Sequence, residues 1–119
     1  MKTIALRRGR AIVPMLLLLG ACQEILRPEE VMDRIERSVT LPDGAAPLSA
    51  YDRSYAFSGP GRIKAIYVRA ADRSAAGKRS WLADPAKLPL GFESGCRQVT
   101  VLYDVTVDRF LYVACTGLA

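Results

Sequence analysis

The chain has 119 residues, of which 50% are hydrophobic and 24% charged, and its formal net charge at pH 7 is +5. Because it contains no histidine, the sequence excludes a Ser/His/Asp triad, a Cys/His pair and a histidine proton shuttle that works near neutral pH. A structural zinc site needs about four ligands, and three cysteines without histidine do not supply them, so we expect no metal and no other cofactor.

The amino-terminal segment has the organisation of a secretion signal. Four basic side chains and no acidic one occur in the first ten residues, and residues 11–21 are then uncharged and mostly apolar. This apolar run is shorter than the ~20 residues that a membrane-spanning helix needs. Pro14 lies within it and disfavours a stable helix. We therefore expect a leader that is removed and not a transmembrane anchor.

The leader ends in the most informative motif of the chain, which consists of Leu19, Gly20, Ala21 and Cys22. An ordinary signal peptidase prefers small residues at the first and third positions before the cut, and Leu19 is too bulky for the third. The motif resembles instead the signal of bacterial lipoproteins. That resemblance implies that the signal peptidase recognises residues 19–21, that residues 1–21 are removed, and that Cys22 carries acyl chains such as palmitate. A conventional signal with an incidental cysteine is the alternative.

The resemblance also indicates where the protein resides. Each methylene buried in a bilayer contributes ~0.8 kcal/mol, so several acyl chains on Cys22 would hold the protein firmly on a membrane. In Gram-negative lipoproteins an aspartate after the cysteine favours the inner membrane, whereas this chain has Gln23. We therefore expect an anchor in the outer membrane facing the periplasm, with residues 22–27 as a lipidated tether.

Removal of the leader changes the charge of the chain. Residues 22–119 carry 13 basic and 12 acidic side chains, a net charge of +1, and the two kinds are interspersed. We therefore expect no nucleic-acid partner, because such partners require clustered positive charge. These 98 residues suffice for one domain with a modest core, which we place at residues 28–119.

The first predicted element is a helix from Pro28 to about Ser38. Proline suits the first turn of a helix, and the two acidic residues that follow suit the positive end of its dipole. The apolar residues of this segment recur at helical spacing on one narrow stripe, which comprises Val31, Met32, Ile35 and Val39. The stripe predicts a helix that packs on the domain's own sheet, with a partner-binding helix as the alternative.

A hairpin is predicted next. Residues 40–50 are rich in proline and small residues and indicate a linker. Two strands at residues 51–58 and 62–71 flank the sequence Gly-Pro-Gly at 59–61, which is typical of a tight turn between antiparallel strands. That sequence lacks the lysine and the following helix of a phosphate-binding loop.

The middle of the chain gives weaker signals. Residues 72–79 are charged and polar and indicate an exposed loop, and residues 80–82 predict a brief third strand. Prolines and glycines then interrupt residues 85–95 repeatedly, so we expect no long regular element there.

The end of the chain predicts a second hairpin, with strands at 96–103 and 109–116 around a turn at 104–108. Once Cys22 is acylated, Cys96 and Cys115 remain as an even pair in an oxidising compartment, and we expect them to form a disulfide. Two reduced thiols are the alternative. If the two cysteines face each other, both thiols lie on one face and apolar pairs form on the other. Those pairs are Val99 with Tyr112 and Val101 with Phe110.

Few residues are candidates for chemistry. Asp104 and Asp108 flank one turn and Glu93 precedes Cys96, and two suitably spaced acids could hydrolyse glycosides. Acids in turns more often cap backbone amides. Basic side chains at Arg62, Lys64 and Arg69 could contact lipid headgroups or an acidic partner, although a solvated sheet edge explains them as well.

Tyrosine is frequent in the predicted domain. Its combination of apolar area and a polar tip suits a recognition surface, although core packing explains tyrosines equally well. The five are Tyr51, Tyr55, Tyr67, Tyr103 and Tyr112.

A second resemblance covers residues 55–117. It is carried by Tyr67-Val68, Trp81, Leu88-Pro89, Gly95-Cys96, Tyr103-Asp104 and Cys115-Thr116-Gly117. These residues resemble small uncharacterised envelope proteins of proteobacteria. The resemblance implies the compartment and the disulfide, and it implies no activity.

Together these features predict an α+β domain, with an N-terminal helix packed on a small antiparallel sheet of four to five strands and a C-terminal disulfide-linked hairpin. We expect a protein that is not an enzyme and that binds another envelope protein through an open surface patch. One alternative is a binder of a small or lipidic ligand, which needs a cavity between helix and sheet. Another is a carboxylate-based hydrolase, which needs two acids that converge.

Overall fold

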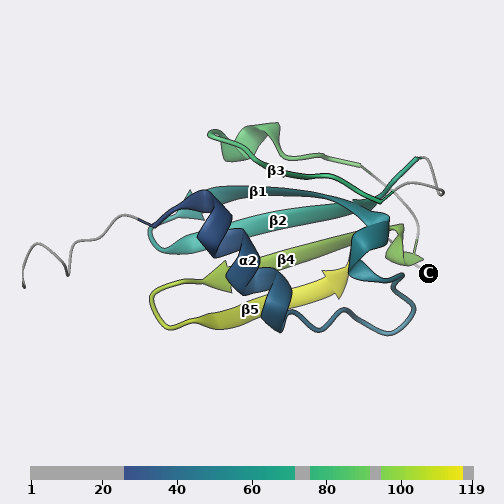
Figure 1. The fold of residues 1–119 in the computed structure, drawn as a ribbon, viewed down its shortest axis with the longest axis horizontal. Coiled ribbons are helices and arrows are strands. Elements are labelled where there is room, and N and C mark those ends of the chain that lie inside the picture. The colour runs from purple at the N-terminus through teal and green to yellow at the C-terminus, as the bar shows by residue number, and fades with distance from the viewer. Residues whose placement is uncertain (1–25, 72–75, 92–94, 117–119) are drawn as a thin grey trace, which may run out of the picture.

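A single helix lies across one face of a five-stranded sheet in the computed structural model, which describes residues 26–71, 76–91 and 95–116 (Figure 1). The α+β class and the helix-on-sheet arrangement are confirmed. The described elements are α2 (Pro28–Ser38), η1 (Leu48–Ala50), β1 (Tyr51–Gly59), β2 (Arg62–Arg69), β3 (Arg79–Trp81), η2 (Pro85–Lys87), η3 (Gly95–Arg97), β4 (Gln98–Asp104) and β5 (Arg109–Cys115), where η marks a short 3-10 turn. The strand order is β3-β1-β2-β4-β5.

The predicted helix is confirmed with its bounds. Pro28 occupies the first turn beside Glu29 and Glu30, and no side chain caps the helix. Val31, Met32 and Ile35 are each at most 2% exposed, because they face the sheet. Packing on the domain's own sheet, and not on a partner, is therefore the role of the apolar stripe.

The hydrophobic core lies between α2 and the sheet. Alternate residues of each strand point toward the helix. The buried side chains of this core are Val31, Met32, Ile35, Tyr51, Tyr55, Ile63, Ala65, Tyr67, Val99, Val101 and Tyr103. Four of the five tyrosines are thus core residues, and only Tyr112 is exposed, at 52%.

The first hairpin forms as predicted. β1 and β2 pair antiparallel from Tyr51 opposite Arg69 to Phe57 opposite Ile63. Gly61 has a φ of +70°, a conformation that favours glycine at the turn.

The short strand β3 pairs parallel to β1, so the sheet is mixed and the expectation of a purely antiparallel sheet was wrong at this strand. The reason is the path of the chain. β2 ends beside the start of β1, and Gly77 then donates its N–H to the carbonyl of Ser49, just before β1. A strand that continues from that point along the free side of β1 must run in the direction of β1.

The second hairpin and its disulfide are confirmed, but the predicted register was wrong. Cys96 and Cys115 form a disulfide, with their Cα atoms 4.6 Å apart. Cys96 lies in the turn η3, before β4 begins, so the rule for facing residues of two strands does not apply to it. The observed facing pairs are Val99 with Cys115, Val101 with Val113 and Leu102 with Tyr112.

In this register two side chains lie on the opposite face of the sheet from the one predicted. Cys115 lies on the helix side with Val99, whereas Tyr112 lies opposite Leu102 on the face turned away from α2. A bulge then leaves Leu111 without a facing residue and brings Phe110 opposite Tyr103, where the two rings pack edge to face.

The face turned away from α2, called the outer face below, is covered only in part. Ala56 and Ile66 are buried there beneath Leu88, which belongs to the segment between β3 and β4. Tyr112 and Thr116 on the same side are exposed. Of the helices in the described ranges, none is both long and apolar enough to cross a bilayer.

Candidate functional site

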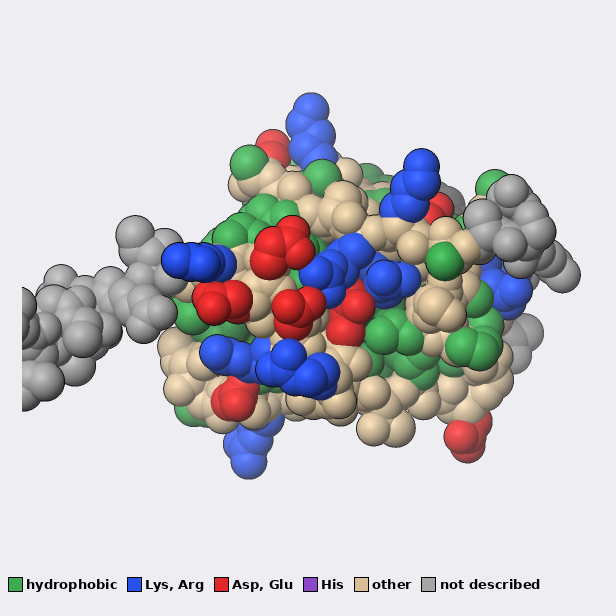
Figure 2. Space-filling model, viewed as in Figure 1, with side chains coloured by type: hydrophobic (Ala, Val, Ile, Leu, Met, Phe, Trp, Pro, Cys, Tyr) green, Lys and Arg blue, Asp and Glu red, His purple; other side chains and the backbone are tan. Residues whose placement is uncertain are grey.

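A cluster of acidic and basic side chains lies over α2 and the neighbouring strands on the face of the molecule that Figure 2 shows. One carboxylate oxygen of Glu36 accepts hydrogen bonds from Arg53 Nε at 2.9 Å and from the Tyr55 hydroxyl at 2.6 Å. The Tyr55 and Tyr67 hydroxyls are 2.8 Å apart. These side chains point toward the helix from the sheet.

Arg79 extends this network along the helix. Its guanidinium lies 2.8 Å from Glu29, 2.8 Å from Asp33 and 3.5 Å from Glu36. The three acids occupy successive turns of α2, so the arginine on the short edge strand holds the helix along most of its length.

The tyrosines of this network act as neutral hydrogen-bonding groups. Burial, followed by the proximity of Tyr67, raises the pKa of Tyr55 far above its ordinary value. Burial also raises the pKa of Tyr67 to about 12. Both hydroxyls therefore stay protonated at neutral pH and cannot act as bases there. Because its charged groups are paired with one another, we interpret the network as the attachment of α2 to the sheet.

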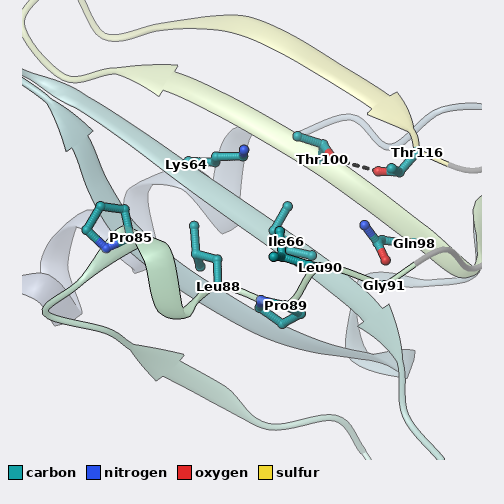
Figure 3. A pocket seen from close by; sticks show the side chains of 10 residues that line it. All are labelled: Lys64, Ile66, Pro85, Leu88, Pro89, Leu90, Gly91, Gln98, Thr100 and Thr116. Carbon is teal, nitrogen blue, oxygen red and sulfur yellow. Dashed lines mark hydrogen bonds between the residues drawn. The ribbon is translucent and has the colours of Figure 1, made fainter.

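A groove on the outer face is the second candidate site (Figure 3). It is open to solvent and has a volume of about 300 Å³, which is at the lower end of the ~300–1,000 Å³ typical of ligand sites. Its lining comes from β2, from the segment before β4, from β4 and from the residue that follows β5. The lining residues are Lys64, Ile66, Pro85, Leu88, Pro89, Leu90, Gly91, Gln98, Thr100 and Thr116.

Two polar groups of the groove have no partner within the described part of the chain. Gln98 is only 3% exposed, and its side-chain oxygen accepts no hydrogen bond. Lys64 makes no ion pair or hydrogen bond through its ammonium group among these residues. A buried acceptor without a donor destabilises the protein, but an atom that solvent cannot reach is also out of reach of a molecule in the groove.

The disulfide holds one end of the groove. Thr116 follows Cys115 directly, and its N–H donates to the carbonyl of Gln98 at 2.8 Å. Its hydroxyl lies 2.5 Å from that of Thr100 (Figure 3). The position of Thr116 in the groove therefore depends on the covalent link between β5 and the turn before β4.

The acids considered for hydrolysis do not converge in the described structure. Asp104 accepts hydrogen bonds from the N–H and the hydroxyl of Thr106, and the hydroxyl contact is the main cause of its lowered pKa. Asp108 has a φ of +55° and lies 3.6 Å from Arg34 on α2. Asp104 therefore stabilises the turn from within, and Asp108 links the turn to α2. Glu93 lies outside the described residues, as do Cys22 and residues 19–21.

The three basic residues of β2 do not form one patch. Lys64 lines the groove, whereas Arg69 is five residues further along the strand and therefore points to the helix side, where its Cζ lies 6.0 Å from the centre of the Tyr51 ring. Arg62 is exposed and faces Asp104 across the strands.

Sequence reasoning missed the groove. The prolines and leucines of residues 85–91 predicted only irregular structure, and they form one wall. The alternation of β4 carried a signal, since Gln98 and Thr100 alternate with buried valines and therefore share the outer face.

Comparison of the chain with protein-family models, with curated proteins and with solved structures found no match. Among the residues that the structure describes, no group of three or more Cys, Asp or Glu side chains could hold a metal ion.

Proposed function

We propose that this chain is a lipid-anchored protein of the bacterial cell envelope that binds a partner in the outer-face groove and acts as an interaction or assembly module. The observation that carries the proposal is the groove itself, in which apolar walls lie beside Lys64, a cation without an ion pair among the described residues. The lipobox-like residues before Cys22 support the location. The partner is then another envelope protein.

Binding without catalysis fits the side chains of the groove. Lys64, Gln98, Thr100 and Thr116 supply hydrogen bonds and one positive charge. Among the described residues, the hydroxyls of Thr100 and Thr116 form a hydrogen bond with each other, and no carboxylate lines the groove beside them. We therefore propose that the protein is not an enzyme.

A binder of a small or lipidic ligand remains the alternative, and the packing gives it less support. Such a ligand was expected between α2 and the sheet, and that interface is filled by buried side chains of the core. Small-molecule sites also enclose most of their ligand, whereas the groove is open to solvent and its lining residue Leu90 is 81% exposed.

Site-specific photo-crosslinking in intact cells tests the proposal. A photoreactive amino acid is placed at Leu90, which lines the groove and is 81% exposed, and in a second strain at Tyr112. Val107, which is 61% exposed on the β4–β5 turn, is the matched control. We expect irradiation to link an envelope protein at the first two positions and not at the control.

Two results would count against this function. Equal crosslinking at Val107 would show that the contacts are not specific to the groove. A phospholipid or metabolite in place of a protein at Leu90 would support the alternative instead.

A further inference from the structure

An aromatic pair lies at the end of the sheet where α2 begins. Phe57 of β1 and Trp81 of β3 pack edge to face, with their ring centroids 5.1 Å apart. Phe57 is nevertheless 42% exposed, and Trp81 is half-buried. The indole N–H of Trp81 forms no hydrogen bond with the described residues and is open to solvent. Both rings therefore keep surface that the described part of the domain does not cover.

These rings lie beside the first turn of α2. Arg79, two residues before Trp81 and on the same side of β3, lies 2.8 Å from Glu29 of that turn. Phe57 is near the end of β1, and Figure 1 shows that β1 ends and α2 begins at the same end of the sheet. Leu26 precedes the helix and is 37% exposed. Leu26, Phe57 and Trp81 are called the N-terminal apolar cluster below.

Little space separates this cluster from the proposed anchor. Leu26 follows Cys22 by four residues, which span at most about 14 Å when fully extended. A folded domain of 100 residues has a radius of gyration of about 13 Å and is thus wider than this gap. A folded partner therefore does not fit between the cluster and a bilayer that holds Cys22, whereas the lipid headgroups are already within reach.

The chemistry of the cluster suits a layer of headgroups. Tryptophan combines an apolar ring with an N–H donor and is enriched where membranes meet water. Arg27 is exposed beside Leu26 and can contact a lipid phosphate. Arg79 neutralises Glu29, but Glu30 is exposed and offsets the charge of Arg27. Apolar burial and not net charge should therefore hold this end, so the contact should persist in high salt.

Resting on the lipid anchor proposed above, we infer that the N-terminal apolar cluster lies in the headgroup layer of the membrane that holds Cys22. The domain then stands on this end of its sheet. Its outer face, which carries the groove, is turned sideways and stays open to a partner.

The fluorescence of Trp81 tests this orientation, because the chain has one tryptophan. The protein is purified from the membranes of cells that express the full chain and is reconstituted into vesicles of phosphatidylethanolamine and phosphatidylglycerol. Some of the phospholipid carries bromine on the acyl chains close to the headgroup, where it quenches a tryptophan that touches it. We expect brominated vesicles to lower the emission of Trp81 severalfold relative to unbrominated ones, in low and in high salt.

A second protein moves the tryptophan to the outer face. It combines Trp81→Phe, which keeps an aromatic ring in the cluster, with Tyr112→Trp at a residue that is 52% exposed. Bromine should leave the emission of this protein nearly unchanged, because the outer face stands beside the bilayer and not against it. Equal quenching of the two proteins would show that the domain has no preferred orientation and would overturn the inference.

Two serine variants locate the contact. Leu26→Ser removes one exposed apolar side chain of the cluster and should weaken the quenching of Trp81 about twofold, because attachment scales with buried apolar area. Leu111→Ser, at a residue of β5 that is 42% exposed, should leave the quenching unchanged. Equal quenching in these two variants would contradict a contact through the cluster.

The mass of the purified protein separates this inference from the function on which it rests. Acylated protein in which bromine does not quench Trp81 would overturn the inference, while the anchor and the groove would stay as proposed. Trp81 that is shielded from aqueous acrylamide but not quenched by bromine would indicate a second copy of the chain over the cluster, which also overturns the inference. A mature protein without acyl chains would overturn the proposed location and the inference together.

Discussion

Gly77 lies at the point where the chain passes the start of β1 on its way to β3. A Cβ atom added there would overlap the carbonyl group of Tyr51, and the N–H of Gly77 is bonded to Ser49 at 2.7 Å. The absence of a side chain at this residue therefore permits the close approach that makes β3 run parallel to β1.

Gly77→Ala is expected to destabilise the fold by about 1–3 kcal/mol, because the backbone must move to admit the methyl group. Urea unfolding followed by the fluorescence of Trp81 would measure this. Ser80→Ala, at an exposed residue of β3, should change the stability by less than about 0.5 kcal/mol. Equal stability of the two variants would show that the chain does not pass β1 this closely.

Tyr51 illustrates how one side chain joins distant parts of the sequence. Its hydroxyl accepts from the N–H of Ala46 at 3.0 Å and donates to the carbonyl of Cys96 at 2.6 Å. The linker after α2 and the turn before β4 are thus both fixed to β1. The sequence identified Tyr51 as a strand residue, but neither contact was predictable because both partners lie in irregular segments.

At the scale of elements, α2 is held by apolar packing beneath it and by charge along its edge. Glu36, Arg53 and Arg79 have side chains that are 15%, 13% and 23% exposed, so solvent screens their ion pairs only in part. The tyrosine hydroxyls complete the network on the buried side.

The tyrosines of this network predict a loss of stability in alkali. The ordinary pKa is 10.0 and that of Tyr67 in the folded protein is about 12. Above pH 10 the unfolded chain therefore loses its tyrosine protons first, and stability should fall as the pH rises from 10 toward 12. Below pH 10 this contribution is fully present. Unfolding in urea at a series of pH values measures it.

Tyr67→Phe should make this decline shallower, because one of the two protected protons is gone. Tyr112→Phe, on the exposed outer face, should leave the decline as in the parent. An equally steep decline in the Tyr67 variant would contradict the assignment.

The elements that could be predicted are those that depend on residues close to one another in the sequence. Helix α2 was predicted from Pro28 and from a stripe of apolar residues within eleven positions. The first hairpin was predicted from the Gly-Pro-Gly turn at residues 59–61. The direction of β3 and the register of β4 with β5 depend on contacts between distant residues. The groove depends on such contacts as well, because its lining spans residues 64–116.

At the scale of the whole molecule, the disulfide closes the end of the sheet that carries the groove. Replacement of both Cys96 and Cys115 by serine should lower the free energy of unfolding by about 3 kcal/mol, according to the chain-entropy model for a loop of this length. Urea unfolding with and without a reductant measures it. Reductant should shift the parent toward the variant and leave the variant unchanged; a reductant effect on the variant would contradict this.

The lipid anchor can be tested on the complete chain. Cys22→Ser should abolish the incorporation of labelled palmitate, because the thiol is the proposed site of acylation. The Cys96→Ser, Cys115→Ser double variant should incorporate palmitate as the parent does. Equal labelling of the Cys22 variant and the parent would argue against acylation.

The start of α2 at Pro28 limits how far the folded body can stand from an anchor at Cys22. Six residues, even when fully extended, reach about 20 Å. A protein tethered in this way samples only a thin shell of solvent beside the lipid headgroups, so its groove would meet polypeptides that pass close to the bilayer and miss those deeper in the compartment.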